Sequence, residues 1–163
     1  MPRPSAPTAV SPHSGIFTDG GCSPNPGPGG WGVVVVEADQ IREQWVGGTS
    51  WSTNNRMELT ALIRAITYVV EEGSAAHLPI YADSQLCVQT YNEWMEGWAK
   101  RGWRRKTGPV ENLDLVQELY ALKQKLKATG SPVTVSWIKA HAGLRWNEYA
   151  DQLVQQGRTA QQP

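Results

Sequence analysis

The fold is decided by residues 15–47, which read GIFTDGGCSPNPGPGGWGVVVVEADQIREQWVG. Runs of apolar and β-branched residues alternate here with Gly/Pro-rich turn signals, and this alternation predicts β-strands. We expect strands over 15–18, 33–36 and 40–47, a turn at 19–21 and a rigid hairpin loop at 25–30. Short connections between successive strands indicate an antiparallel meander.

Helices and strands alternate through the rest of the chain. Apolar residues at helical spacing predict a long helix over 55–72, which Gly73 ends. After it we expect a strand over 78–82, a helix from the capping Ser84 to about residue 91, an amphipathic helix around 115–126, a strand over 132–138 and a last helix over 146–156. This order predicts an α/β fold, a mixed five-stranded sheet with three antiparallel then two parallel strands and helices on both faces.

Length and composition limit the class of protein. At 163 residues the chain suits one domain, and it contains no apolar run of the roughly 20 residues that a membrane helix needs. The start of the chain resembles no secretion or import signal, so we expect a cytoplasmic protein that does not bind membranes. Nothing indicates an obligate protein partner, and a monomer is the default expectation.

We expect one folded domain, residues 15–157, between two flexible ends. Residues 1–14 hold four prolines without a periodic apolar pattern, which predicts a disordered tail. Residues 158–163 form a short flexible C-terminal tail in this interpretation. Cys22 and Cys87 lie far apart with no metal-ligand spacing, so neither a disulfide framework nor a zinc site is expected.

Positive charge is concentrated in one segment. The net charge is zero, which argues against a protein that coats nucleic acid by bulk charge, yet five of the 15 Lys and Arg residues lie within 100–106. This segment and the residues just before it hold Trp94, Trp98, Lys100, Arg101, Trp103, Arg104, Arg105 and Lys106. Interleaved aromatic and basic side chains can hold a nucleic-acid backbone. The alternative is a solvated helix face on which Trp94 and Trp98 pack as an i, i+4 pair.

Two acidic residues follow predicted strands. Asp19 comes after the strand over 15–18, and Asp83 comes after the strand over 78–82. Ligand sites in open α/β sheets gather beyond strand ends, so both carboxylates are candidates for a functional site. Turn chemistry is the alternative for each of them, because Asp is favoured in turns before Gly or Ser.

Two further acids lie on predicted helices. Glu58 shares the apolar, sheet-facing stripe of Leu62 and Val69, where an unpaired carboxylate would be costly. The alternative is a capping role, since Asn55 and Glu58 have the spacing of an N-cap and its third helical residue. Asp151 opens the last helix, and a solvated helix-start acid is the simpler explanation for it alone.

Four carboxylates that converge on one place would repel one another unless cations neutralised them. An all-oxygen cluster suits Mg²⁺, with Mn²⁺ as a possible substitute. Two such ions about 3.5–4 Å apart can activate a water on one side of a phosphodiester and stabilise the leaving oxygen on the other. The four acids, taken together, therefore indicate phosphoryl-transfer chemistry.

Ordered blocks of sequence surround these acids. They are IFTDGGC at 16–22, NPGPGGWG at 25–32, TNNRMEL at 53–59, ADSQ at 82–85, KAHAG at 139–143 and NE at 147–148 before Asp151. In this order and spacing they closely resemble the type 1 ribonuclease H family of bacteria. The resemblance implies a ribonuclease H-like catalytic domain over 15–157. It also implies an endonuclease that hydrolyses the RNA strand of RNA–DNA hybrids and leaves 5′-phosphate and 3′-hydroxyl ends.

The resemblance implies residue roles as well. By it Asp19, Glu58, Asp83 and Asp151 bind two Mg²⁺ ions when substrate is present, and His141, in a mobile loop, assists proton transfer or product departure. The residues that would contact the hybrid are Cys22 and Asn25 in the first loop, Asn54, Asn55 and Gln85 at the RNA strand, and Thr53, Arg56 and Asn112 around a DNA phosphate. Segment 94–106 looks like the basic protrusion with which many bacterial members grip the DNA strand, and we call it the protrusion.

Departures from the family and alternative functions stay open. LRW at 144–146 replaces the smaller, more polar residues expected in the His loop, and Gly21 stands where the family often has Ser. The alternative functions are a DNA-acting nuclease of the same fold superfamily and a non-catalytic hybrid-binding module. The second is disfavoured because binding alone needs no repulsive carboxylate cluster facing a polyanion.

Overall fold

A computed structural model describes residues 11–73, 78–130 and 133–161. The disorder expected for residues 1–10 and the tail residues 162–163 lie outside these ranges. Residues 11–14 were also expected to be disordered, and here the structure shows otherwise. Ser14 Oγ accepts a hydrogen bond from the Ala38 amide (2.8 Å), and His13 Nδ1 lies 2.6 Å from Asp39 Oδ2, so this segment is held on the turn at 38–39.

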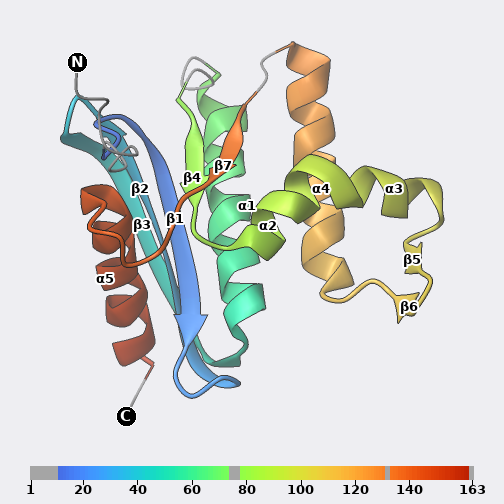
Figure 1. Cartoon of the computed structure of the whole chain (residues 1–163), viewed down its shortest axis with the longest axis horizontal. Coiled ribbons are helices and arrows are strands. Elements are labelled where there is room, and N and C mark those ends of the chain that lie inside the picture. Colours follow the sequence, from blue (N-terminus) through green and yellow to red (C-terminus); the bar gives the residue numbers. More distant parts are fainter. Residues whose placement is uncertain (1–10, 74–77, 131–132, 162–163) are drawn as a thin grey trace, which may run out of the picture.

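One mixed five-stranded sheet forms the centre of the fold (Figure 1). Its strands, in spatial order, are β3 (Gln40–Ser52), β2 (Gly27–Glu37), β1 (Gly15–Cys22), β4 (Ile80–Ala82) and β7 (Val135–Trp137). β2 pairs antiparallel with both β1 and β3, and β4 pairs parallel with both β1 and β7. The predicted sheet, with three antiparallel strands and then two parallel ones, is therefore confirmed.

Helices cover both faces of the sheet (Figure 1). They are α1 (Asn54–Glu72), α2 (Gln85–Gln89), a π-helical turn (Thr90–Trp94), α3 (Met95–Lys100), α4 (Leu113–Thr129) and α5 (Arg145–Thr159). α5 packs on one face, while α1 and α2 pack on the other and α4 packs against α1. α5 thus runs into residues 158–163, which the sequence assigned to a tail. Within the described ranges, no helix is both long and apolar enough to cross a membrane.

The first hairpin is longer than expected. β1 continues through the expected turn at 19–21 and ends at Cys22, so that turn was wrong. The hairpin loop expected at 25–30 shrinks to residues 23–26 because β2 begins at its glycines. Glycines of both strands allow close packing where the sequence indicated turning. A Cβ on Gly20, for example, would collide with the backbone of α1.

The protrusion begins as a helix that leaves the body of the protein. The helix expected to end near residue 91 continues through the π-helical turn and α3 to Lys100. A small hairpin of β5 (Arg104–Arg105) and β6 (Gly108–Pro109) follows and projects away from the sheet (Figure 1). Lys123 of α4 lies 2.7 Å from Glu96 of α3, so α4 anchors the base of the protrusion.

Two apolar cores hold the layers together. The larger one joins the sheet to α1, α2 and α4 and contains the fully buried Leu62 and Leu119. The smaller one joins β1 and β2 to α5 through Phe17, Trp146 and Leu153. Complete burial of one such side chain stabilises the fold by about 1.5–3 kcal/mol. The cores therefore fix the elements that carry the four candidate acids.

Glycines let α5 approach the sheet closely. A Cβ on Gly30 would collide with the Val154 carbonyl, and a Cβ on Gly157 would collide with the Gly47 carbonyl. We call this contact the glycine seam, and it consists of Gly30, Gly32, Gly47, Gly48 and Gly157. Because α5 carries Asp151, the seam sets how far that acid lies from the sheet.

Candidate active site

Asp19 is the most buried of the four candidate acids. It lies within β1, where the sequence placed it after the strand, and its side chain and backbone are 8% exposed. Its Oδ1 accepts a hydrogen bond from the Gly20 amide (2.8 Å). Burial, and then the nearby negative charges of Asp83, Glu58 and Asp151, raise the pKa of Asp19 to about 9. The structure therefore brings the four predicted acids into one electrostatic neighbourhood.

Glu58 reaches this neighbourhood from α1. The helix is capped by Thr53, whose Oγ1 accepts a hydrogen bond from the Arg56 amide (3.3 Å). The capping alternative, in which Asn55 begins the helix and Glu58 closes the cap, was therefore wrong. Burial, together with the charge of Asp83, raises the pKa of Glu58 to about 7, although a hydrogen bond with Ser84 opposes the shift. Glu58 thus faces the other acids, as its place on the apolar stripe predicted.

Asp83 and Asp151 complete the group from two other elements. Asp83 directly follows β4, as predicted, and its Oδ2 accepts a hydrogen bond from Asn147 Nδ2 (3.2 Å). Asp151 lies in the second turn of α5, because that helix begins at Arg145, and not at its start as expected. Its Oδ2 accepts from Gln155 Nε2 (3.3 Å). Four separate elements thus supply the acids.

The donor chemistry of this group fits a hard divalent cation. All four side chains offer carboxylate oxygens, and the raised pKa of Asp19 shows that this acid resists ionising beside the others without added positive charge. In the described ranges, no three Asp, Glu, His or Cys side chains are gathered closely enough to hold a metal ion as they stand. Three of the acids instead bond to the neighbours Asn147, Ser84 and Gln155. Cation binding would therefore draw the carboxylates together from a preformed but looser group.

Without divalent cations, we expect the protein to lose stability as the pH rises from about 5.5 to about 8.5. Folding raises the pKa of Asp19 from 3.8 to about 9 and of Glu58 from 4.5 to about 7. These groups stabilise the fold most below their unfolded pKa values, and that contribution is lost as the pH rises through 7 and 9. Cations that bind only the folded state should oppose the loss.

Thermal unfolding at both pH values, in EDTA and in Mg²⁺, measures this dependence. We expect Mg²⁺ to raise the Tm more at about pH 8.5 than at about pH 5.5. Asp19→Asn, which removes the most shifted group, should flatten the pH dependence in EDTA. A Tm in EDTA that is the same at both pH values would contradict the expectation.

His141 lies in the loop between β7 and α5. It is exposed and adopts a left-handed backbone conformation (φ 54°), and Gly143 does so too (φ 80°). The residues that depart from the family pattern, 144–146, follow Gly143 directly. Leu144 and Trp146 are buried, and Trp146 Nε1 donates a hydrogen bond to Asp39 Oδ1 (2.9 Å). They anchor the start of α5, so the departure from the family pattern stabilises the base of the His loop.

A polar groove brings together most of the predicted hybrid-contacting residues. It is lined by Asn25, Pro26, Thr53, Asn54, Asn55, Glu111 and Asn112. Two hydrogen bonds tie the first loop to the start of α1. Asn54 Oδ1 accepts from the Cys22 amide (2.7 Å), and the Asn54 amide donates to Asn25 Oδ1 (3.1 Å). Cys22 therefore supports the groove through its backbone.

Arg56 and Gln85 lie outside that lining. Arg56 donates to both carboxylate oxygens of Asp114 (3.0 and 2.8 Å) and to Asn112 Oδ1 (3.4 Å), so it orients Asn112 from the side. The Arg56 guanidinium in turn lowers the pKa of Asp114 to about 2. Gln85 is exposed at the start of α2, two residues after Asp83.

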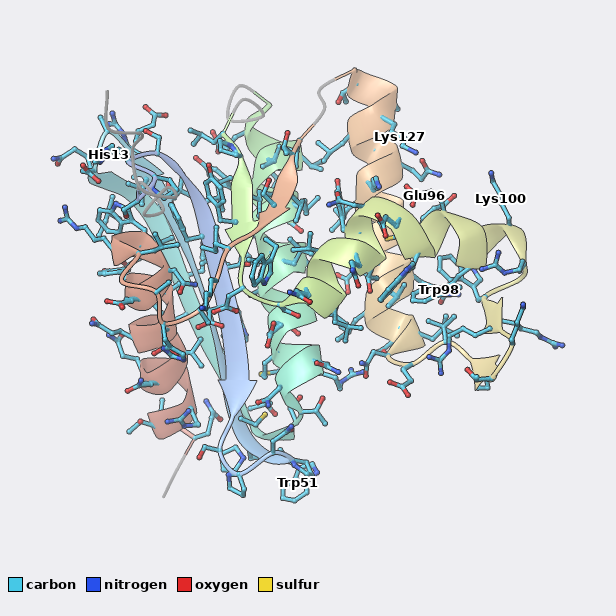
Figure 2. The ribbon with its side chains drawn as sticks, in the orientation of Figure 1. His13, Trp51, Glu96, Trp98, Lys100 and Lys127 are labelled. Carbon is cyan, nitrogen blue, oxygen red and sulfur yellow. The ribbon has the colours of Figure 1, made fainter. Side chains whose placement is uncertain are left out.

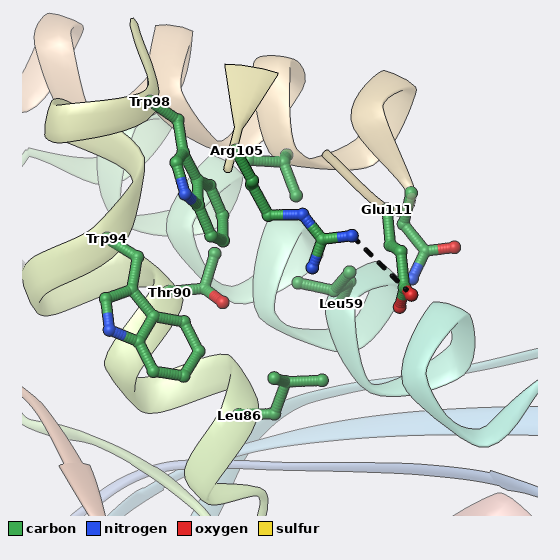
Figure 3. Close-up of a pocket in the computed structure, with 9 residues that line it drawn as sticks. Leu59, Leu86, Thr90, Trp94, Trp98, Arg105 and Glu111 are labelled. Atoms are coloured by element: carbon green, nitrogen blue, oxygen red, sulfur yellow. Dashed lines mark ion pairs between the residues drawn. The ribbon is translucent and has the colours of Figure 1, made fainter. Parts of the chain in front are cut away.

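The protrusion contributes two further hollows. The basic hollow is lined by Trp98, Arg101, Arg104, Arg105, Lys106 and Thr107. The apolar hollow lies between α2 and α4, and its lining includes Leu86, Thr90, Trp94 and Trp98 (Figure 3). Arg105 crosses the mouth of this hollow toward Glu111.

The tryptophans of the protrusion also have packing roles. Trp94 and Trp98 contact each other with ring centroids 5.9 Å apart, as the alternative interpretation predicted. Both still line the apolar hollow, so packing and binding are compatible. Trp103 packs edge-on against Tyr120 and so supports the protrusion from within. Lys100 extends outward at the end of α3 (Figure 2).

A family comparison decides which family this fold belongs to. The model of the RNase H family matches residues 12–159. This chain belongs to the ribonuclease H family. The resemblance inferred from the sequence and the fold expected from it are thereby confirmed.

Curated relatives within the ribonuclease H family carry the same name. The Ribonuclease H of Methylorubrum extorquens (strain PA1) is 47% identical over 143 residues, which cover 88% of this chain and 59% of that protein. The chain thus spans about three fifths of the length of this relative. The Ribonuclease H of Polaromonas sp. (strain JS666 / ATCC BAA-500) is 42% identical, and the match covers 87% of this chain and 86% of that protein.

Solved ribonuclease H structures share the fold. The N-terminal RNase H domain of a Mycobacterium tuberculosis protein is 25% identical with a TM-score of 0.67, covering 91% of this chain and 96% of that one. LC11-RNase H1, solved in complex with an RNA/DNA hybrid, is 25% identical with a TM-score of 0.63. That match covers 89% of this chain and 96% of LC11-RNase H1.

Sequence reasoning missed three residues of this ribonuclease H site. Asn147 was seen only as part of a motif, yet its buried amide holds Asp83. Asp114 orients Arg56, and Glu111 lines the polar groove. The closeness of Glu111 and Asp114 to Asn112 in the sequence was the available signal. Nothing in the pattern told which way these acids would point.

Proposed function

We propose that this protein hydrolyses the RNA strand of RNA–DNA hybrids with two divalent cations, Mg²⁺ in the first place, bound by Asp19, Glu58, Asp83 and Asp151. The observation that carries the proposal is the coupling of three acids from separate elements to the buried Asp19. Membership of the ribonuclease H family and the likeness to LC11-RNase H1, solved with a hybrid, support the substrate. A non-catalytic binder would have no need of this repulsive group.

The four carboxylates differ in burial and in the element that carries them. Burial raises the pKa of both Asp19 and Glu58, so their oxygens are the least solvated, while Asp83 and Asp151 approach from the end of β4 and from α5. Bound divalent cations would supply an activated water and stabilise the leaving oxygen. His141, exposed on its loop, is placed to carry a proton away from the departing product.

Substrate recognition would use the three hollows in succession. The polar groove offers amide and hydroxyl groups at the start of α1, the helix that carries Glu58, as recognition of a 2′-hydroxyl requires. Thr53 and Asn112 in the groove, with Arg56 beside it, would hold a DNA phosphate. The protrusion would add contacts from Trp and Arg side chains to the DNA strand. Such contacts address the backbone and the sugar, so we expect little sequence preference.

A cleavage assay tests the proposal directly. With Mg²⁺ we expect cutting of the RNA strand of a hybrid, with 5′-phosphate and 3′-hydroxyl ends, and cutting of duplex RNA or duplex DNA slower by at least about 100-fold. EDTA should stop the reaction. Cleavage that persists in EDTA would exclude the cation mechanism. Equal cutting of duplex DNA would support the alternative of a DNA-acting nuclease.

We propose further that the protein acts as a monomer in the cytoplasm. All four acids and the three hollows come from one chain, so catalysis needs no residue from a second copy. A sedimentation measurement with and without hybrid tests this point. A hybrid-bound dimer as the active species would contradict it.

A further inference from the structure

The three hollows adjoin one another. The polar groove and the apolar hollow share Glu111 and Asn112, and the apolar hollow and the basic hollow share Trp98 and Arg105. We call this succession of hollows the binding track. A polyanion that enters the polar groove and extends to the protrusion must therefore pass Glu111.

Glu111 places a negative charge on the path that a polyanion would follow through the binding track. Among the described residues that line the three hollows, it alone carries a carboxylate. Its side chain is 74% exposed, so no buried role explains the charge. Like charges a few ångströms apart repel, and a phosphate in the track would meet this repulsion.

Glu111 also engages a cation of the track. Its Oε1 lies 3.8 Å from Arg105 Nη2, and Figure 3 shows the two side chains pointing toward each other across the mouth of the apolar hollow. Arg105 Nε also donates a hydrogen bond to the Pro109 carbonyl (3.3 Å). In the free protein the guanidinium thus already faces acceptors of the protein itself. An exposed pair at this distance is weak, so a phosphate can displace the carboxylate.

We propose that Glu111 competes with a nucleic-acid phosphate for Arg105 and thereby holds the affinity for the hybrid below what the basic residues alone would give. This inference rests on the proposed function, because it assumes that a hybrid occupies the binding track. Glu111 would then determine how strongly the protrusion retains nucleic acid. The competing explanation is a purely structural pair that holds the β5–β6 hairpin against α4. That pair would make removal of Glu111 neutral or harmful to binding.

Hybrid binding in EDTA, where cleavage is absent, separates these explanations. The variant is Glu111→Gln, and the matched control is Glu118→Gln, which removes the same charge from an exposed position of α4 outside the track. Fluorescence anisotropy with a labelled hybrid measures the Kd. We expect Glu111→Gln to tighten binding roughly fivefold at low salt, and the gain should shrink as salt screens the charges. The control should stay within about twofold of the unchanged protein.

A second background tests whether Glu111 acts through Arg105. In the Arg105→Ala protein, Glu111→Gln should tighten binding by less than about twofold. The guanidinium for which the Glu111 carboxylate and the phosphate compete is then absent. A gain of the same size with and without Arg105 would overturn the competition. A Glu111→Gln variant that binds no tighter than the Glu118→Gln control would also overturn it. An unchanged protein that neither binds nor cuts hybrid would instead refute the proposed function, which distinguishes the two failures.

Discussion

Asp19→Asn is expected to abolish hybrid cleavage, with a fall in kcat on the order of 10⁴-fold. Asp19 is the buried acid to which the charges of Asp83, Glu58 and Asp151 are coupled. An amide keeps the shape of the side chain but removes the negative charge that cations require. Single-turnover cleavage of a labelled hybrid in Mg²⁺ measures the effect.

The same substitution should stabilise the protein when no divalent cation is present. In EDTA at about pH 8, below the raised pKa of about 9, folding of the unchanged protein must protonate Asp19, which is ionised in the unfolded chain, and the variant bears no such cost. We expect a Tm higher by at least about 3 °C, which corresponds to roughly 1 kcal/mol for a domain of this size. Glu148→Gln, at an exposed site on α5, is the control for a lost charge. An Asp19→Asn protein that is folded and keeps more than about a tenth of the activity would refute the assigned role.

Replacing Arg101, Arg104 and Arg105 together with Ala is expected to weaken hybrid binding by roughly 50- to 100-fold at low salt. These three side chains line the basic hollow, and the β5–β6 hairpin that carries Arg104 and Arg105 projects away from the sheet (Figure 1). Each phosphate that a cation binds releases counterions, so the slope of log K against log salt should become shallower by about 1 for each phosphate that the variant no longer binds. Anisotropy titrations at several salt concentrations measure both quantities.

A matched triple variant separates this effect from a general loss of charge. Arg42, Lys125 and Lys127 are exposed and lie outside the three hollows, so their replacement by Ala should leave the salt slope nearly unchanged. Thermal unfolding should show that both triple variants fold. An unchanged salt slope in the Arg101/Arg104/Arg105 variant would contradict phosphate binding by the protrusion. It would favour the alternative in which this segment is a solvated helix face.

The sheet and the acids were predictable because their signals are local. A β-branched run such as Val33–Val36 and the helical spacing of Leu62 and Val69 each follow from side chains that face a core. Asp83 lies directly after its strand as expected, since Ser84 caps the next helix. Ordered motifs then placed the acids within one family.

Glycines and the first residues of helices were harder to interpret. A glycine can form a turn or allow close packing, and an acid near a helix start can be a cap or part of a site. Gly20 looked like part of a turn, but it allows β1 to pass close to α1. The two-residue shift of the N-cap, from Asn55 in the capping interpretation to Thr53 in the structure, decided whether Glu58 was a capping residue or a member of the acid group. Only packing between distant elements resolves such choices.

Pairings that depend on the path of the folded chain could not be predicted at all. His13 was assigned to a disordered tail, yet it meets Asp39, and Asp39 in turn accepts from Trp146. The pairing of Glu111 with Arg105 depends on how the β5–β6 hairpin folds back toward α4. Neither pairing has a periodic pattern or a motif that would reveal it.

The glycine seam has a consequence for protein engineering. Since backbone meets backbone where Gly30 faces Val154 and Gly157 faces Gly47, no change of side chain on one partner can compensate for a bulkier residue on the other. α5, β2 and β3 should therefore be exchanged together when segments of this protein are replaced by those of a relative. A chimera with a relative should preserve activity when all three elements are swapped together, and a graft of α5 alone should displace Asp151 from the other acids.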